Sequence, residues 1–590
     1  MKKKPKRNDS RTVVSSEKMP SRDGMLLEER KKILSDPPQK ALERILNAPE
    51  PAALVHSFPE EDFYYLLHEI GPEDALPLMS LASDRQWEHI LDREAWKKDR
   101  IELSCVTRWL ELMLKCDAVR CIKWFIEQKT DFIEFYLFKN IEIAIREPDQ
   151  DPSDLPDDFF TFDDTFYIRI LDLPPDAPLD EKADKERKET IKRFLDHMAV
   201  YDYKKYQGVL LETTGIIPAE TEEECYRLRN VRLAEKGFLP FEEAMGVYQP
   251  VRAEDLKKQT PKHILTEEAE VDLSLPVPFY PTNMMDSENL FAEALRNITP
   301  TVAMEQLQSE FAALCNQVAV ADQKDIKEKE QLRPVVKKAS GYLSIALEEL
   351  TKDQPHRRLE KASAFIVRYP LNQIFRLGFG YALQLKWRAE SWKKQAWFKR
   401  QGLPLSFWGE QWLGVLGGLL IKKPLFYDNY KTGELYREFQ SLEDIKQTES
   451  TLNEIIAFDD FLSHMEIELH QRPRRFMTYK NFLLTLWAHS YLGLSEQLHP
   501  LKLDEFRRFF DELFENPEAD ALEVPRKTKI RMKESFLNWL SEKSGYTPYK
   551  ISQQLGKILE DLFTEIESEY GRVARKDLDP RFIYLFLVEK

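Results

Sequence analysis

The sequence predicts an all-α, multi-domain protein. Glycine contributes only 19 of 590 residues, less than half its usual share of about 7%, which disfavours a turn-rich β structure. Apolar residues recur at helical spacing along most of the chain, and a chain of this length allows roughly two to four domains. We expect a superhelical N-terminal array of short helices, a small β-hairpin insert and a larger C-terminal helical domain.

The first segments are distinguished by charge and by helix-start signals. Residues 1–24 are polar and basic, and we expect a disordered tail. Residues 25–146 repeatedly place proline or serine before acidic residues, which is typical of a helix start. Ser83 and Gln86 have the spacing of a capping box. Because helix starts recur at short intervals along residues 25–146, we expect short helices that stack on one another to bury their apolar faces.

Residues 147–186 form an acidic, proline-rich insert. Within it, Phe159 to Ile170 is aromatic and β-branched around Asp163 and Asp164, which predicts a short hairpin. Residues 187–250 resume the helical pattern of the N-terminal domain.

Prolines interrupt residues 251–285, and we expect a linker there. Residues 286–590 are predicted to form the C-terminal helical domain. Its last apolar segment, Phe582 to Val588, is expected to pack into a core.

Composition excludes several classes of protein. The 86 Lys and Arg residues against 102 Asp and Glu give a net charge of −16, which argues against a generally basic nucleic-acid binder. The five cysteines are odd in number and widely spaced, so neither a disulfide framework nor a thiolate zinc site is expected. No apolar stretch follows the basic N-terminus, and the most apolar window, Trp412 to Ile421, is too short to span a bilayer. We therefore expect a cytoplasmic protein.

Two resemblances accompany these patterns. The rhythm of helix starts in residues 25–146 resembles the helical array in the cytosolic N-terminal domain of magnesium transporters and in flagellar motor switch proteins. The segments FRLGFGYALQLKWRAE, LPLSFWGEQW, KKPLFYDNY and YREFQSLEDI, with EIGPEDALPLMSLAS and RLRNVRLAEKGF, resemble a bacterial family of uncharacterised helical proteins. That resemblance covers nearly the whole chain except the basic tail. It implies no activity and no catalytic residues.

A basic and aromatic segment between residues 386 and 400 is the first candidate site. Aromatic stacking combined with phosphate contacts would suit single-stranded nucleic acid, and the same pattern would suit an acidic membrane surface. The alternative is a helix packed on more than one side, with lysine and arginine stems covering apolar surface. The candidate interaction residues are Lys386, Trp387, Arg388, Trp392, Lys393, Lys394, Trp397, Lys399 and Arg400.

Glu410 is the candidate catalytic residue. It lies among Trp408, Gly409 and Trp412, and apolar surroundings would raise the pKa of its carboxyl toward that of a general acid or base. No second catalytic group has an informative spacing. A structural glutamate bonded to a helix N-terminus or an arginine is the alternative.

Asp460, His464 and Glu468 follow one another at spacings of four residues, which would place them on one helical face. Imidazole and carboxylates on adjacent turns are compatible with a metal. The set has no HExxH arrangement, and charged helices often produce such combinations, so no metal and no cofactor are expected.

Motifs for named reactions are absent from the sequence. It contains no GxxxxGK[ST] phosphate loop and no GxSxG nucleophile elbow. We therefore expect a helical interaction or scaffold protein whose partner is another protein. Binding of nucleic acid or a membrane surface through residues 386–400 is the first alternative, and an enzyme of unrecognised type is the second.

Overall fold

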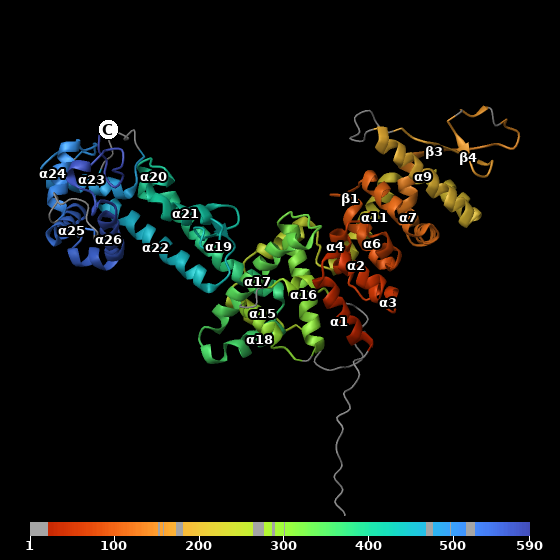
Figure 1. The fold of residues 1–590 in the computed structure, drawn as a ribbon, viewed down its shortest axis with the longest axis horizontal. Coiled ribbons are helices and arrows are strands. Elements are labelled where there is room, and N and C mark those ends of the chain that lie inside the picture. Colours follow the sequence, from red (N-terminus) through yellow and green to blue (C-terminus); the bar gives the residue numbers. More distant parts are fainter. Residues whose placement is uncertain are drawn as a thin grey trace, which may run out of the picture. The chain divides into compact units, whose positions relative to one another are not determined.

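The computed structural model describes residues 22–151, 154–156, 158–172, 181–262, 277–285, 289–299, 301–465, 467, 476–495, 497–514 and 525–589. The prediction of an all-α fold is confirmed, because helices form nearly every element of these residues and the strands are short (Figure 1). The predicted disordered tail over residues 1–24 lies almost entirely outside the described residues, and the first helix begins at Arg22.

The chain divides into two compact units whose segments alternate along the sequence. The first unit contains Met1–Val247, Lys262–Ser287 and Leu295–Val336, and the second contains Tyr248–Pro261, Glu288–Ala294 and Lys337–Lys590. The division differs from the predicted boundary at 251–285. The described part of that stretch contains two short helices with buried residues, α13 (Ala253–Lys258) and α14 (Tyr280–Asn283).

The first unit is an array of helices, many of them short, as the sequence predicted. Besides α14, its helices are α1 (Arg22–Ser35), α2 (Pro38–Leu46), α3 (Pro51–His56), α4 (Glu60–Ile70), α5 (Leu76–Ser80), α6 (Asp84–Glu94), α7 (Leu103–Gln128), α8 (Thr130–Asn140), α9 (Glu181–Tyr201), α10 (Tyr203–Thr213), α11 (Pro218–Glu235), α12 (Phe241–Ala244) and α16 (Thr301–Ala321). The long helix α7 packs against α5, α6, α8 and α9.

Local capping explains where several of these helices begin. The capping box predicted at Ser83 and Gln86 is present at the start of α6, with each side chain bonded to the other residue's backbone N–H. Helix α7 breaks at Asp117, whose backbone is not helical. The Asp117 carboxylate accepts the backbone N–H of Arg120 at 3.0 Å, so it caps the second half of that helix.

The acidic insert contains the predicted hairpin. Strand β4 (Phe160–Thr161) pairs antiparallel with β5 (Phe166–Ile170). In the turn between them, Asp164 has a φ of 56°, and the Asp163 carboxylate accepts the backbone N–H groups of residues 165 and 166. This local bonding allows the Asp-Asp pair to form the turn.

A third strand completes this small sheet. The sequence predicted that its residues belong to the helical array. Strand β3 (Ile141–Ile145) pairs antiparallel with β5, which gives the strand order β3-β5-β4. The sheet lies beside α9 (Figure 1). A further two-stranded ribbon, β1 (Trp96–Lys97) with β2 (Arg100–Ile101), connects α6 to α7.

The second unit is built around long helices. Besides α13, its helices are α18 (Arg358–Arg368), α19 (Leu371–Gln395), α20 (Trp397–Arg400), α21 (Gly409–Leu420), α22 (Leu442–His464), α23 (Tyr479–Tyr491), α24 (Leu503–Leu513), α25 (Ile530–Ser544) and α26 (Pro548–Tyr570). Two more helices, α15 (Leu290–Arg296) and α17 (Lys329–Thr351), contain residues of both units. Short 3-10 turns are η2 (Met245–Tyr248), η3 (Pro355–Arg357), η4 (Leu405–Trp408) and η5 (Arg575–Asp577).

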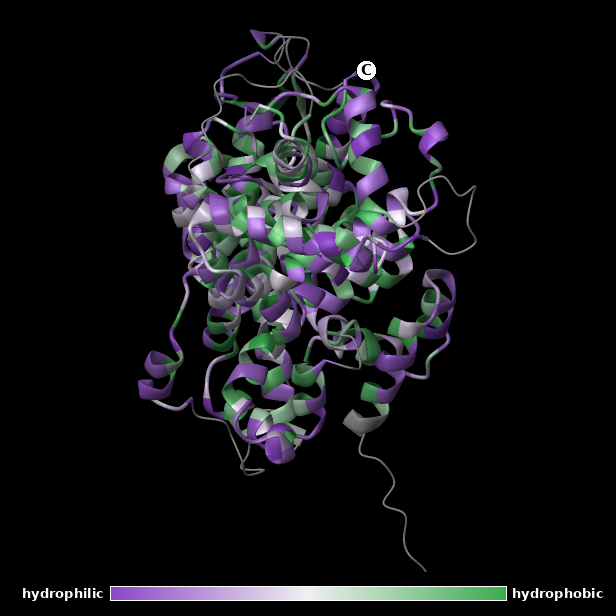
Figure 2. Cartoon of the chain, turned by 90° about the vertical axis from the view of Figure 1, so that its left-hand side faces the viewer, coloured by the Kyte–Doolittle hydropathy of each residue, from purple (hydrophilic) through white to green (hydrophobic). Residues whose placement is uncertain are grey.

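Helix α22 links the two parts of the second unit. It packs against α19, α20 and α21, and also against α25 and α26, and α23 to α26 gather near one of its ends (Figure 1). Hydrophobic and hydrophilic residues alternate along individual helices (Figure 2), so that each helix can bury one face.

The glycines of α21 allow a hairpin to lie against the helix. A Cβ atom at Gly414 would come within 2.4 Å of the Tyr427 ring, and one at Gly418 within 2.5 Å of a backbone oxygen. The hairpin consists of β6 (Phe426–Tyr427) and β7 (Tyr436–Arg437). These glycines therefore let the hairpin approach the helix closely.

Candidate functional site

The aromatic residues of the 386–400 segment are largely buried against α22. Asp459 on α22 accepts hydrogen bonds from the indole Nε1 of Trp392 at 3.1 Å and from the backbone N–H groups of Trp397 and Phe398 at 2.9 and 3.1 Å. All three aromatic side chains are buried. Asp459 thus joins the end of α19 to the start of α20, and these rings cannot stack on nucleic-acid bases.

The basic residues of the same segment lie nearer the surface. The Arg388 guanidinium pairs with Glu449 at 2.7 Å, and the Lys386 ammonium pairs with Glu390 at 3.0 Å. Lys394, Lys399 and Arg400 are exposed, as is nearly half of Trp387, while Lys393 is partly exposed. Binding of nucleic acid or of a membrane surface through these residues stays a prediction. Trp387 is exposed while Trp392 and Trp397 are buried, so the segment does not present several rings for stacking.

Glu410 does not have the apolar surroundings that the sequence suggested. It lies in the first turn of α21 and is exposed, while Trp408 and Trp412 beside it are buried. The first turn of a helix points its side chains in different directions, so neighbours in sequence do not share an environment. A catalytic role of Glu410 therefore stays a prediction, without the apolar surroundings on which it was based.

The three residues considered as metal ligands are not all described. Asp460 and His464 are exposed on α22, and the His464 Nδ1 lies 2.8 Å from the backbone oxygen of Asp460. Glu468 lies outside the described residues. Within the part of the chain that the structure describes, no three histidine, cysteine or acidic residues are grouped to hold a metal ion.

A buried polar network in the first unit contains several strongly perturbed titratable groups. The Tyr64 hydroxyl donates to the Glu94 carboxylate at 2.5 Å, and the Lys327 ammonium lies 3.0 Å from its other oxygen. The His68 Nε2 is 3.4 Å from the same carboxylate. Burial alone would raise the pKa of Glu94, but its partners His68, Tyr64 and Lys327 lower it to about 2.

Neighbouring groups extend this network between α4, α6 and α14. The Arg93 guanidinium lies over the rings of Tyr64 and Phe238, 4.7 and 4.4 Å from their centroids. Burial holds the pKa of His89 well below its usual range. The Asp62 carboxylate accepts the backbone N–H of Phe279 at 2.8 Å, and burial raises its pKa to about 7.

The groups of this network are of the kinds found in active sites, but they are too deeply buried for a substrate to reach them. Only about 11% of the His68 side chain and 6% of the Glu94 side chain are exposed, and Asp62 and His89 are buried. Perturbed pKa values also arise in structural networks. We therefore interpret this network as structural: it fixes α4 and α6 to segments that follow more than 200 residues later in the chain.

An exposed aromatic patch lies in the second unit. It consists of Phe476, Phe582 and Tyr584, which are 67%, 74% and 51% exposed. The side-chain amide of Asn481 donates to the backbone oxygens of both Phe476 and Tyr584, at 3.3 and 3.5 Å. This shared contact holds the two ends of the patch together. Single exposed apolar residues are ordinary, whereas clustered aromatic residues mark interaction surfaces.

Charged residues border the aromatic patch. Lys480 pairs with Glu565, and Arg581 pairs with Asp579 at 2.6 Å. Burial and the carboxylate of Glu569 raise the pKa of Tyr584. The patch therefore has an apolar centre and a polar rim, the arrangement that is usual for protein interfaces.

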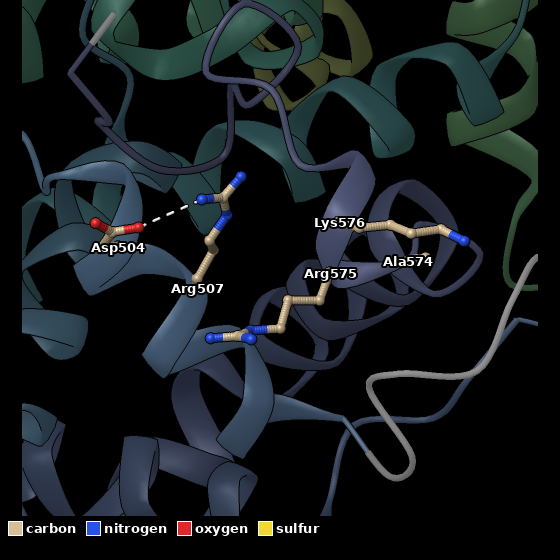
Figure 3. Close-up of a pocket in the computed structure, with 5 residues that line it drawn as sticks. All are labelled: Asp504, Arg507, Ala574, Arg575 and Lys576. Carbon is tan, nitrogen blue, oxygen red and sulfur yellow. Dashed lines mark hydrogen bonds and ion pairs between the residues drawn. The ribbon is translucent and has the colours of Figure 1, made fainter.

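A cavity of about 470 Å³ in the same unit is lined by Asp504, Arg507, Ala574, Arg575 and Lys576. We call it the arginine cavity. Arg507 comes from α24 and Arg575 from η5, and the Lys576 side chain points away from both (Figure 3). Arg507 pairs with Asp504 at 3.3 Å, and Arg575 with Asp511 at 3.1 Å.

Sequence reasoning missed both surfaces. Arg507 and Arg575 are far apart in the chain and belong to no motif, so only the fold brings them together. The patch had a local signal: residues 582 to 585 alternate between exposed and buried side chains, which is the period of an extended segment. The prediction of a buried C-terminal segment is correct for Ile583 and for residues 585–588, but wrong for Phe582 and Tyr584.

Comparison with known proteins identifies a family, and the function of that family is unknown. Neither the curated proteins nor the solved structures contain a match, so the resemblance to magnesium transporters rests on the rhythm of helix starts alone. The model of a family of unknown function, DUF6178, matches residues 22–589. That match agrees with the expected kinship over nearly the whole chain except the basic tail. The chain belongs to the family of unknown function DUF6178.

Proposed function

We propose that this chain is a helical interaction protein that binds a partner protein through the aromatic patch. The observation that carries the proposal is the exposure of Phe476, Phe582 and Tyr584, whose two segments are joined by the Asn481 side chain. Aromatic residues are enriched among the few side chains that supply most of the binding energy at interfaces. Ile583 and Leu585, which alternate with Phe582 and Tyr584 along the chain, are buried, so packing holds this exposed segment in place.

The charges around the patch indicate the class of partner. Glu565, Glu569 and Asp579 lie next to its aromatic residues. Glu565 and Asp579 are paired with Lys480 and Arg581, so the rim has no excess of cations that would attract an anionic membrane surface or a nucleic-acid backbone. A protein surface with apolar side chains at its centre and polar groups at its edge is complementary to the patch.

The proposed location is the cytoplasm. All five cysteines lie in described segments and are free thiols, which suits a reducing compartment. Among the described helices, none has the length and apolarity needed to cross a bilayer.

Capture from native cytosol followed by reconstitution tests the proposal. The tagged chain and a variant with Phe476→Ser, Phe582→Ser and Tyr584→Ser would be treated with nuclease and compared by mass spectrometry. The control is Tyr549→Ser, because Tyr549 is 78% exposed and is not part of the patch. Any stoichiometric partner would then be purified, and its affinity for all three proteins measured by calorimetry.

We expect the partner to bind the wild type and the control equally. The patch variant should bind at least about 100-fold more weakly, since truncating three interface aromatics at about 1–2 kcal/mol each costs about 3 kcal/mol or more. Equal affinity for the patch variant would show that the patch is not the interface. Recovery of the wild-type chain without a stoichiometric partner would contradict the proposed function.

A further inference from the structure

We propose that the second unit binds an anionic phospholipid surface through a face that combines exposed apolar side chains with lysines. We call it the basic face, and it consists of Trp387, Lys393, Lys394, Ile421 and Lys422. The inference goes beyond the proposed protein interaction and uses a different surface of the second unit. It rests on the exposure of these side chains, on a hydrogen bond that joins their two elements and on lysines without acidic partners.

Two large apolar side chains of the basic face are exposed. Trp387 on α19 is 48% exposed, and Ile421, directly after α21, is 43% exposed. Helices α19 and α21 pack side by side (Figure 1), and the Lys386 ammonium donates to the backbone oxygen of Ile421 at 2.5 Å. This bond holds Ile421 and Lys422 beside the turn of α19 that contains Trp387.

The lysines of the basic face lie next to these apolar side chains. The exposed residues in this part of α19 are 384, 387, 388, 391, 394 and 395, which is the spacing of one helical face. Trp387 and Lys394 are both on that face. Lys393 is partly exposed, and Lys422 is exposed beside Ile421.

These lysines are not neutralised by the protein. Among the described residues, Lys393, Lys394 and Lys422 form no ion pair. Carboxylates are abundant, because the chain has 102 acidic residues and 86 Lys and Arg residues. Residues 386–400 nevertheless contain six Lys and Arg residues and a single acidic residue. A local excess of unpaired cations in an acidic protein is complementary to an anionic surface.

The net charge of −16 does not prevent this contact. Salt screens exposed charges over about 10 Å at an ionic strength of 0.1 M. An anionic surface that touches the basic face therefore responds mainly to the charges next to it. Basic residues close to an anionic leaflet each contribute to binding within the same short distance.

The combination of lysines with few apolar side chains favours lipid over nucleic acid. Single-stranded nucleic acid is held by successive bases stacked on several aromatic rings. Trp392, Trp397 and Phe398 of the same segment are buried, so they are not available for stacking. A lipid surface accepts tryptophan and isoleucine at the boundary between headgroups and acyl chains, with lysines at the level of the phosphates.

Flotation of the full chain with lipid vesicles tests this inference. The vesicles consist of phosphatidylcholine alone or of phosphatidylcholine mixed with phosphatidylglycerol, at low and at high sodium chloride. We expect binding to the anionic vesicles at low salt, loss of that binding at high salt and no binding to phosphatidylcholine alone. Equal binding to both kinds of vesicle, or binding to neither, would overturn the inference.

A charge variant tests the lysines. Lys393→Gln, Lys394→Gln and Lys422→Gln together should lower the partition coefficient for anionic vesicles at least about 20-fold. The control makes the same change of net charge at three exposed lysines of the first unit, with Lys123→Gln, Lys204→Gln and Lys324→Gln. Equal partition of the two variants would show that the basic face is not the contact.

An apolar variant tests the insertion of side chains. Trp387→Ser should lower the partition coefficient at least about 5-fold, whereas the control Tyr549→Ser, at a residue that is 78% exposed and outside the basic face, should not. If Trp387→Ser fails to fold, Ile421→Ser tests the same face. Unchanged partition of the folded Trp387 and Ile421 variants would contradict insertion into a lipid surface.

Nucleic acid and an acidic protein segment are the other anionic partners. Fluorescence anisotropy with a single-stranded oligonucleotide and with an oligoglutamate peptide separates them from lipid. We expect both probes to bind more weakly than the anionic vesicles. Binding of either probe that requires the three lysines, together with no binding of the vesicles, would overturn the assignment to a lipid surface.

Discussion

Asp62 shows at the residue scale how burial and hydrogen bonding oppose each other. Its carboxylate is buried in the first unit and accepts backbone N–H groups from Phe279 and Tyr280. Burial raises its pKa more strongly than these bonds lower it, to about 7. In the unfolded chain the same carboxyl titrates near its ordinary value of 3.8. The folded state therefore holds a proton that the unfolded state has already released.

The sign of the resulting pH dependence follows from that difference. Between the two pKa values the folded chain binds more protons than the unfolded chain, so the free energy of unfolding falls as pH rises from about 4 to about 7. The contribution is about 1.4 kcal/mol for each unit of pKa difference. Asp62→Asn should remove this part of the profile.

Urea unfolding at a series of pH values checks this expectation. The control is Glu43→Gln, which removes an exposed carboxyl from α2 and should leave the profile unchanged. If the Asp62→Asn and wild-type curves stayed parallel from pH 4 to 7, the carboxyl would not titrate there.

His489 on α23 should act with the opposite sign. Burial, with the neighbouring His499 ring 4.2 Å away, lowers its pKa to about 4. Its contribution to stability is present above the unfolded value of about 6.5 and is lost as pH falls toward 4. His489→Phe should therefore reduce acid sensitivity in this window, measured by thermal unfolding. The exposed His356 provides the control, His356→Gln, and equal acid sensitivity of both variants would contradict the expectation.

Individual residues also show where sequence reasoning stops. Glu410 lies between tryptophans in sequence but is exposed. Asp459 belongs to no sequence motif, yet it accepts hydrogen bonds from three aromatic residues. Sequence neighbours on a helix face different sides. The environment of a side chain depends on which helices pack against it, and this information is not local.

At the scale of elements, close approach of two helices makes Gly378 irreplaceable. A Cβ atom at Gly378 on α19 would lie 1.9 Å from the backbone oxygen of Tyr342 on α17. Backbone atoms cannot move aside as a flexible side chain can. The rings of Tyr342, Phe375 and Phe379 pack together at this contact, and separating the helices would disrupt them.

Gly378→Ala should therefore lower the free energy of unfolding by about 3 kcal/mol or more. The matched control is Gly556→Ala in α26, where an added Cβ meets nothing within 4 Å. That change should stabilise the chain by about 0.5–1 kcal/mol, because alanine favours the helix. Chemical denaturation of both variants checks the pair, and similar values would contradict the close contact.

Elements were predictable where their signals were local. The capping box at Ser83 and the hairpin around Asp163 formed as expected. Thr221 and Glu224 also have the spacing of a capping box, but α11 begins at Pro218, so Thr221 lies inside the helix and does not cap it. Strand β3 was missed because its short alternating run follows a helix directly, and its partner β5 lies beyond the acidic insert. Pairing across such a distance leaves little trace in the strand itself.

At the scale of the whole molecule, consecutive residues can belong to different units. Tyr248 belongs to the second unit and Val247 to the first. The Tyr248 ring packs against Phe375 and Phe379 on α19, with centroid separations of 6.1 and 4.7 Å. The predicted linker at 251–285 overlooked this sharing because prolines mark interruptions in helices, not the unit to which each piece belongs.

Tyr248→Ala should loosen α19 without affecting α4 or α6. Loss of a buried aromatic side chain costs about 3–5 kcal/mol, and hydrogen exchange read by mass spectrometry would show faster exchange in α19. Val247→Ala is the control, because the neighbouring residue belongs to the other unit. Faster exchange in α19 caused by Val247→Ala, or none caused by Tyr248→Ala, would contradict this division.

The buried network of the first unit has a consequence for folding during synthesis on the ribosome. Asp62 meets Phe279 across 217 residues, and Glu94 meets Lys327 across 233. At about 5–20 residues per second, α4 and α6 wait roughly 10–45 s for these partners to be synthesised. Throughout that wait the Asp62 and Glu94 carboxylates lack these partners, although α4 and α6 can already pack on each other. The nascent chain should therefore depend on chaperones that hold helical faces until more than half of the protein has emerged.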